Sequence, residues 1–210
     1  MLIIEGSDLV GKTTFAKKML DFLNSTAKMP HIYAHFSKLP DAFNFFTHYL
    51  ERASRNIVQD RFHMSEIVYS NVCRYHNGQS PLYPEKYRLV DAYLRYLGAI
   101  TVVIIAEPTW LKRQVKEKHS RGEMFSEEQI VRVNDAFGYL CHKDQETART
   151  FNWLADYNPD IDFVYCVSES NPHPAENANF CAQVLEAYLN RLDLLDTLIG
   201  ARGPWMLTGI

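Results

Sequence analysis

The chain has 210 residues, 47% of them hydrophobic, which is enough for one substantial core and predicts a single domain over residues 1–210. Its net charge of −3 gives no overall basic field for nucleic acid, and no apolar run reaches the roughly 20 residues that a membrane span needs. The four cysteines form no C-x-x-C pair, which favours free thiols in the cytoplasm over a zinc site or disulfides.

The first predicted elements are a strand, a glycine-rich loop and a helix. An apolar run at residues 2–4 leads into the loop Gly6-Ser7-Asp8-Leu9-Val10-Gly11-Lys12-Thr13, which matches the phosphate-binding pattern G-x-x-x-x-G-K-[S/T]. Glycines let such a loop turn its N–H groups toward phosphate oxygens, while Lys12 reaches the β- and γ-phosphates and the Thr13 hydroxyl ligates Mg²⁺. Apolar spacing over residues 12–24 predicts a helix whose N-terminal dipole favours the anion. The loop therefore predicts a nucleoside triphosphate site with Mg²⁺ as cofactor, since a plain glycine turn does not explain Lys12 and Thr13 at this offset.

Further apolar runs alternate with helical patterns along the chain. Strands are predicted at residues 31–36, 56–59, 100–105 and 161–167, and helices at residues 110–119, 126–140 and 176–198. Ser126 and Gln129 form a capping-box pair at the start of the second of these helices. Residues 77–84 are predicted to form a surface loop and the tail from Gly200 to be irregular. Near-continuous apolar strands are typical of parallel sheets, so we expect an α/β fold with a parallel sheet of about five strands and helices on both faces.

The pair Asp60-Arg61 follows directly after the predicted strand at residues 56–59. Ligands of open α/β sheets gather at the carboxyl ends of the strands, so both side chains are expected to face the glycine-rich loop. There Asp60 could hold Mg²⁺ through water or accept a substrate proton, and Arg61 could clamp a phosphate. An ordinary solvated turn is the alternative interpretation of such a pair.

A basic segment follows the predicted strand at residues 100–105. It contains Lys112, Arg113, Lys116, Lys118 and Arg121. Positive charge on a short helix and turn suits a lid over a triphosphate, because it neutralises charge on the transferred phosphoryl group. We therefore expect a small lid around residues 112–125, with Arg121 as its catalytic cation. The alternative is an exposed basic helix end.

Two of these motifs together resemble the thymidylate kinase branch of P-loop nucleotide kinases. The family opening E-G-x-D-x-x-G-K-T-T is matched by Glu5-Gly6-Ser7-Asp8 and Gly11-Lys12-Thr13-Thr14, and the D-R-[Y/F] element by Asp60-Arg61-Phe62. The resemblance extends to the region of Leu140. It implies a P-loop nucleoside triphosphate hydrolase fold and, in nucleotide biosynthesis, transfer of the γ-phosphoryl group of ATP to a (deoxy)nucleoside monophosphate such as dTMP.

The resemblance also implies roles for individual residues. Asp8 contacts the acceptor nucleotide and its metal, Arg61 binds the acceptor monophosphate, and Asp60 supports Mg²⁺ or the acceptor end of the site. Apart from the resemblance, Phe62 and Tyr69 lie at or after the Asp60-Arg61 pair and are candidates for stacking on the acceptor base, with a place in the hydrophobic core as the alternative. The ATP-binding set comprises Gly6, Ser7, Asp8, Leu9, Val10, Gly11, Lys12, Thr13, Thr14 and Arg113, the last similar to the arginine that packs on adenine.

Other functions stay open beside this one. A kinase for a nucleoside, or for a hydroxymethylated base in a nucleotide or in DNA, would use Asp60 as a general base. A GTPase-type switch is disfavoured because the sequence has no N-K-x-D motif, and a motor ATPase because the strand at residues 100–105 carries no terminal Asp-Glu pair.

Residues 60–66 are also similar to phage-type deoxynucleotide kinases, which would act in a host cytoplasm. ATP and a nucleotide are the expected partners, and a homodimer is left open. Arg88 and Arg95 are further candidates for the acceptor phosphate, or for a solvated helix face.

Overall fold

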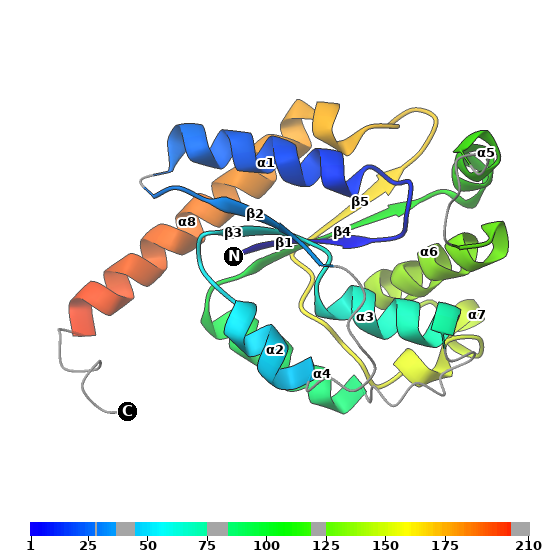
Figure 1. Cartoon of the computed structure of the whole chain (residues 1–210), viewed down its shortest axis with the longest axis horizontal. Helices are drawn as coiled ribbons and strands as arrows, with labels where there is room; N and C mark the ends of the chain where they lie inside the picture. Colours follow the sequence, from blue (N-terminus) through cyan, green and yellow to red (C-terminus); the bar gives the residue numbers. More distant parts are fainter. Residues whose placement is uncertain (28, 37–44, 75–83, 119–124, 203–210) are drawn as a thin grey trace.

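The computed structural model describes residues 1–27, 29–36, 45–74, 84–118 and 125–202. In these residues five parallel strands form one sheet in the order β2-β3-β1-β4-β5, with helices on both faces (Figure 1). The strands are β1 (Leu2–Gly6), β2 (Ile32–His35), β3 (Ile57–Asp60), β4 (Ile100–Ala106) and β5 (Phe163–Val167). The predicted α/β class and the five-stranded parallel sheet are therefore confirmed.

Two helical layers cover the sheet. One face carries α1 (Lys12–Thr26) and α8 (Ala178–Arg202), and the other carries α2 (Phe45–Arg52), α3 (His63–Tyr69), α4 (Pro84–Tyr96) and α6 (Glu127–His142) (Figure 1). Helix α5 (Pro108–Lys118) follows β4. Short elements complete the chain: the π-helix η1 (Ser70–Arg74), α7 (Gln145–Ala148), η3 (Asn152–Leu154) and η4 (Pro174–Glu176).

The alternation of side chains along β1 explains the two layers. Ile3 is buried in the core cluster formed with α2, α3, α4 and α6, whereas Leu2 and Ile4 are buried in the cluster formed with α1, α5 and α8. Successive side chains of a strand point to opposite faces, so an uninterrupted apolar run fills both clusters. The same geometry brings the ends of β1 and β3 side by side, because Ile4 pairs with Asp60.

The boundaries of the predicted strands and helices lie within about two residues of those observed, except at the end of the last helix, whereas α2, α4 and α7 were not predicted. The capping box is present, since Ser126 Oγ accepts from Gln129 N at 3.2 Å and Gln129 Oε1 accepts from Ser126 N at 3.0 Å. The expected irregular tail from Gly200 is wrong for residues 200–202, which continue α8. Most of the predicted loop at 77–84 and part of the predicted lid, residues 119–124 with Arg121, lie outside the described residues. No helix in the described part of the chain is long and apolar enough to cross a membrane.

Candidate functional site

The glycine-rich loop joins the carboxyl end of β1 to α1. Gly6 has φ 134°, and a Cβ at this residue would lie 1.9 Å from the carbonyl oxygen of Ile104 on β4. Only glycine tolerates both this backbone conformation and such a close approach. Leu9 and Gly11 also have positive φ, 68° and 86°. These left-handed residues curl the loop tightly over the edge of the sheet.

The loop ends at the N-terminus of α1, where backbone donors are available. The first helical hydrogen bond runs from Phe15 N to Gly11 O at 3.0 Å, so the N–H groups of the first turn have no acceptor within the helix. Gly11 at the N-cap offers no side chain to cap them. Together with the positive end of the helix dipole, these donors make the loop a site for an anion.

Lys12 lies folded back onto the loop. Its side chain is almost fully buried, and its ammonium group donates to the carbonyl oxygen of Ser7 and lies 3.8 Å from Asp8 Oδ1. Burial, followed by the nearby charge of Arg61, lowers the pKa of Lys12 to about 8. The group is therefore held inside the loop, next to its anion-binding donors, and remains charged at neutral pH.

Asp60, at the end of β3, faces the start of α1. Its Oδ2 atom accepts from Thr13 Oγ1 at 2.5 Å and from the Tyr33 hydroxyl at 2.9 Å, and it lies 3.1 Å from His35 Nδ1. Burial alone would raise the pKa of Asp60, but the hydrogen bonds from Thr13 and Tyr33 and the charge of Lys12 outweigh it and lower the pKa. Asp60 is therefore held as a carboxylate beside the loop.

Thr13 and Asp60 offer the kind of oxygen donors that Mg²⁺ prefers. Asp60 Oδ1 has no hydrogen-bond partner within the described residues, so one carboxylate oxygen is available to a cation or its water. No group of three or more His, Cys, Asp or Glu side chains able to hold a metal ion occurs in the described ranges. The pair fits a metal that takes its remaining ligands from phosphate oxygens and water.

Arg61 meets the glycine-rich loop from the neighbouring strand. Its φ of 65° is unusual for a residue with a side chain, and the backbone is held by bonds from Arg61 N to Ile4 O and from Gln59 Nε2 to Arg61 O, both 2.9 Å. The guanidinium donates to the Asp8 carboxylate and lies 4.9 Å from the ring centre of Tyr69. Arg61 therefore faces the glycine-rich loop, as predicted, and the structure brings Asp8, Arg61 and Tyr69 together.

Glu5 anchors the turn that carries Arg61, a role that the sequence analysis does not assign. Its fully buried carboxylate accepts from the backbone N–H groups of Phe62, Met64 and Ser65 at 3.0, 3.1 and 3.2 Å, and also from the Ser65 hydroxyl. The backbone donors belong to the N-cap residue Phe62 and to the first turn of α3, whose N–H groups lack helical acceptors. Glu5 thus ties the start of α3 to β1.

Asn134 on α6 is a second supporting residue without a sequence signal. Its Oδ1 atom accepts from Ser7 Oγ at 3.1 Å and from Ala106 N at 2.8 Å, while its Nδ2 donates to Ala106 O at 2.9 Å. The buried amide therefore joins the glycine-rich loop, the end of β4 and α6. In the sequence Asn134 is only a lone asparagine inside a predicted helix, and this does not identify its distant partners.

The remaining predicted residues differ in position. Phe62 is fully buried, with its ring 4.8 Å from that of Tyr49 and 6.1 Å from that of Phe36. In the structure its ring belongs to the core, which favours the alternative interpretation over an acceptor contact. Arg113 is half-exposed on α5, and its Nη1 lies 2.6 Å from Glu169 Oε1 in the segment after β5. It therefore lies at the same edge of the sheet as the loop.

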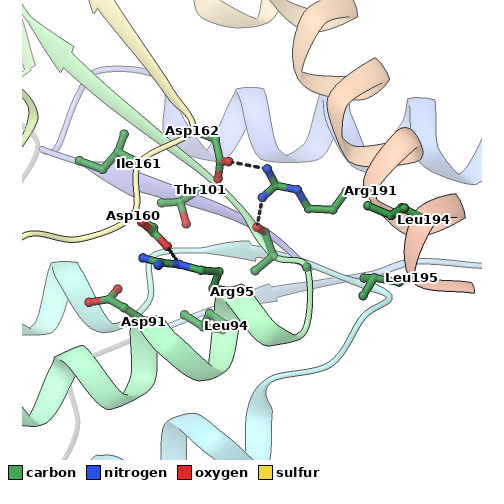
Figure 2. Close-up of a pocket in the computed structure, with 12 residues that line it drawn as sticks. Asp91, Leu94, Arg95, Thr101, Asp160, Ile161, Asp162, Arg191, Leu194 and Leu195 are labelled. Carbon is green, nitrogen blue, oxygen red and sulfur yellow. Dashed lines mark hydrogen bonds and ion pairs between the residues drawn. The ribbon is translucent and has the colours of Figure 1, made fainter. Parts of the chain in front are cut away.

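Arg88 and Arg95 on α4 are not brought to the loop. Arg88 donates to the carbonyl oxygen of Asp156, and Arg95 pairs with Asp160. Figure 2 shows Arg95 in a cavity of about 410 Å³ that is also lined by Thr101, at the start of β4, and by Arg191 from α8. That cavity lies at the amino end of the strands, opposite the glycine-rich loop.

Comparison with protein-family models, with curated proteins and with solved structures finds no match to this chain. What the protein does is therefore inferred from the geometry of the site.

Proposed function

We propose that the chain is an ATP-dependent nucleoside monophosphate kinase with the P-loop nucleoside triphosphate hydrolase fold, acting on a deoxypyrimidine nucleotide such as dTMP. The observation that carries the proposal is the approach of Arg61 to the glycine-rich loop through Asp8. An anion-binding loop and an arginine from the next strand face one another. Phosphoryl transfer between two phosphorylated substrates needs two phosphate-binding sites that are held at a fixed distance and orientation.

On the donor side, the loop N–H groups and Lys12 would bind the β- and γ-phosphates of ATP. Lys12 now donates to the Ser7 carbonyl, and a phosphate oxygen would replace that neutral acceptor with a charged one. A charge-assisted hydrogen bond is stronger than a neutral one. Arg113 and the lid cations, including Arg121, would complete this side by contacting adenine and the transferred group.

Thr13 and Asp60 would hold Mg²⁺ beside these phosphates. When bound, the ion neutralises charge on the phosphate oxygens. The low pKa of Asp60 keeps its carboxylate ionised for this role. Tyr33 and His35 orient the same carboxylate from β2, so its position does not depend on Thr13 alone.

On the acceptor side, Arg61 would exchange Asp8 for the monophosphate of the acceptor. Tyr69 lies beneath the guanidinium, and the hydrogen bonds from Arg61 N to Ile4 O and from Gln59 Nε2 to Arg61 O fix the backbone. The monophosphate oxygen is already a nucleophile, so the reaction needs no covalent intermediate and no general base. The residues contribute positioning and charge neutralisation.

A hydroxyl acceptor, in a nucleoside or a hydroxymethylated base, is the alternative function. It would benefit from a general base with a pKa near the working pH, and Asp60 is the candidate of the sequence analysis. The position of Arg61 beside the loop favours the monophosphate, because an uncharged hydroxyl acceptor has no phosphate for the guanidinium to clamp.

The test is a transfer assay with ATP, Mg²⁺ and a panel of acceptors. The panel contains the four deoxynucleoside monophosphates, the matching nucleosides and oligonucleotides with hydroxymethylated bases, and products are separated by mass. We expect a nucleoside diphosphate with the wild-type chain and none with Lys12→Ala. A product only from nucleosides or oligonucleotides would replace the proposal with the alternative, and ATP hydrolysis without any acceptor would overturn both.

A further inference from the structure

A cavity of about 410 Å³ lies at the amino ends of β4 and β5, opposite the glycine-rich loop (Figure 2). It is called here the amino-edge cavity. Helix α4 supplies Leu94 and Arg95 from one face of the sheet, and α8 supplies Arg191, Leu194 and Leu195 from the other. A volume of this size is typical of a pocket for a small molecule. The phosphate chemistry proposed above uses none of these residues.

Arg191 is held in a fixed orientation in the wall of this cavity. Its Nη1 donates to the carbonyl oxygen of Ala99 at 2.9 Å, and its Nη2 lies 3.0 Å from Asp162 Oδ1 (Figure 2). Asp162 is itself anchored, because its Oδ2 accepts from Thr101 N at 2.8 Å. A guanidinium has five N–H groups, and these contacts leave some of them unused. Arg191 therefore presents further donors without first having to be ordered, which lowers the entropic cost of binding a ligand.

Arg95 adds a second guanidinium group at the rim of the cavity. Its side chain is 67% exposed, and its Nε donates to the carboxylate of Asp160. The Nη1 and Nη2 atoms of Arg95 have no hydrogen-bond partner within the described residues. Each arginine of the cavity is thus oriented by one aspartate and keeps N–H groups for another acceptor.

The carboxylates of the cavity are less available than the guanidinium groups. Both oxygens of Asp162 have the partners given above, and Asp91 Oδ1 lies 2.6 Å from His63 Nε2. The other oxygen of Asp91 is buried away from solvent. Free N–H donors therefore predominate, and a planar guanidinium matches a carboxylate through two parallel hydrogen bonds. Because each arginine charge is already balanced by an aspartate, a singly charged anion is repelled less than a doubly charged phosphate.

Apolar side chains make up most of the remaining lining. Leu94 is buried, Ile161 and Leu195 are half-buried, and Leu194 is 60% exposed. Figure 2 shows Leu194 and Leu195 on the same stretch of α8 as Arg191. A hydrocarbon group placed against these side chains would remove their apolar surface from water, which is favourable. The cavity therefore combines cationic donors with an apolar wall.

We propose that the amino-edge cavity is a binding site for a small aliphatic carboxylate. The carboxylate accepts hydrogen bonds from the free N–H groups of Arg95 and Arg191. The hydrocarbon chain of the ligand lies against Leu94, Leu194 and Leu195. This site is separate from the glycine-rich loop, and the proposal does not depend on the proposed function.

The experiment titrates the full chain with butanoate, hexanoate and octanoate and follows the backbone amide resonances by NMR. The amides of Thr101 and Asp162 report on the cavity, and those of Gly11 and Lys12 report on the glycine-rich loop. We expect hexanoate to shift the first pair. Burial of one CH₂ group strengthens binding by up to about fourfold. The dissociation constant should therefore fall by up to about fifteenfold from butanoate to hexanoate.

Three variants test the two halves of the site. Arg191→Gln should weaken hexanoate binding by about tenfold, and Arg95→Gln by up to about fivefold because that side chain is more exposed. Leu194→Ser changes an exposed position, so the variant should fold, and it should reduce the gain in affinity per CH₂ group while butanoate binding changes little. Arg113→Gln, which removes an arginine paired with Glu169 at the opposite edge of the sheet, is the matched control and should bind hexanoate like wild type.

Other probes distinguish this ligand from different chemistries. Hexylamine that binds at Thr101 and Asp162 as tightly as hexanoate would show that the aspartates, and not the arginines, select the ligand. Inorganic phosphate that binds there more tightly than hexanoate would show that the apolar wall takes no part. Either result, or shifts confined to Gly11 and Lys12, would overturn the proposal. The kinase proposal is tested separately through phosphoryl transfer and does not depend on these results.

Discussion

The Arg61 guanidinium donates a hydrogen bond to the Asp8 carboxylate and thereby joins the turn after β3 to the glycine-rich loop. Both groups are only partly exposed, at 25% and 15% of their side-chain surface. Each charge is satisfied by the other, so a phosphate that binds Arg61 must compete with Asp8. The pair therefore connects the donor side of the proposed site, at the glycine-rich loop, to its acceptor side at Arg61.

Lys12→Ala should abolish phosphoryl transfer and leave the fold intact. The ammonium group contacts the loop carbonyl of Ser7, and it is placed to meet phosphate, so its loss removes charge stabilisation of the transferred group. The free energy of unfolding should change by less than about 1 kcal/mol, because removal of a buried charge also removes its desolvation cost. Transfer rates and thermal unfolding measure the two effects. Lys18→Ala, at an exposed position of α1, is the control, and normal turnover in Lys12→Ala would exclude this loop as the donor site.

Arg61→Ala should weaken binding of the acceptor far more than binding of ATP. A hydrogen bond to a charged group contributes about 1.5–3 kcal/mol, which corresponds to a loss of roughly tenfold to a hundredfold in acceptor kcat/KM. Arg61→Lys keeps the charge but not the planar fork, and should recover only part of that loss. Initial rates at varied acceptor and varied ATP separate the two substrates. Equal effects on both KM values would contradict an acceptor role.

Glu5→Gln should weaken binding of the acceptor indirectly, through the position of Arg61. The amide presents one acceptor oxygen where the carboxylate presents two, so N–H groups at the start of α3 lose a partner. Loss of a buried hydrogen-bond partner costs about 1–3 kcal/mol of unfolding free energy, and the acceptor KM should rise because Arg61 loses its anchor. Urea unfolding and acceptor kinetics provide the readouts, with the exposed Glu186→Gln as control. A stable variant with an unchanged acceptor KM would show that Glu5 does not position Arg61.

The pH dependence of kcat/KM for ATP should report the lowered pKa of Lys12. The ammonium form binds phosphate, and in the free protein it predominates below a pKa of about 8. The value of kcat/KM for ATP should therefore be constant below about pH 7 and fall as the pH rises through about 8, approaching a tenfold decrease per pH unit above it. Lys12→Arg, whose guanidinium does not titrate in this range, should lack that decline. A wild-type profile that stays flat to pH 10 would contradict the shift.

Local patterns predict the sheet and the glycine-rich loop because their causes lie close together in sequence. The uninterrupted burial of β1 and the offset of Lys12 and Thr13 from Gly6 depend on neighbouring residues alone. Asp60 and Arg61 were predicted at the loop because parallel strands end at one edge. The structure brings Asp60 within hydrogen-bond distance of Thr13.

The supporting residues could not be predicted in the same way. Asn134 contacts Ser7 across 127 positions, and Glu5 contacts α3 across 57 to 60, so only the folded chain reveals their partners. The direction of the Phe62 side chain could not be predicted either, because the sequence does not reveal the positive φ of the preceding Arg61. The π-helix η1 also has no periodic sequence signal.

The most direct test of the central claim follows the γ-phosphoryl group itself. Wild-type protein is incubated with γ-³²P-labelled ATP, Mg²⁺ and dTMP or dCMP, and the labelled products are separated by chromatography. The proposed function predicts label in the corresponding deoxynucleoside diphosphate, and no labelled diphosphate with Lys12→Ala. Label that appears only in inorganic phosphate, or only in the product of an unphosphorylated nucleoside, would contradict it.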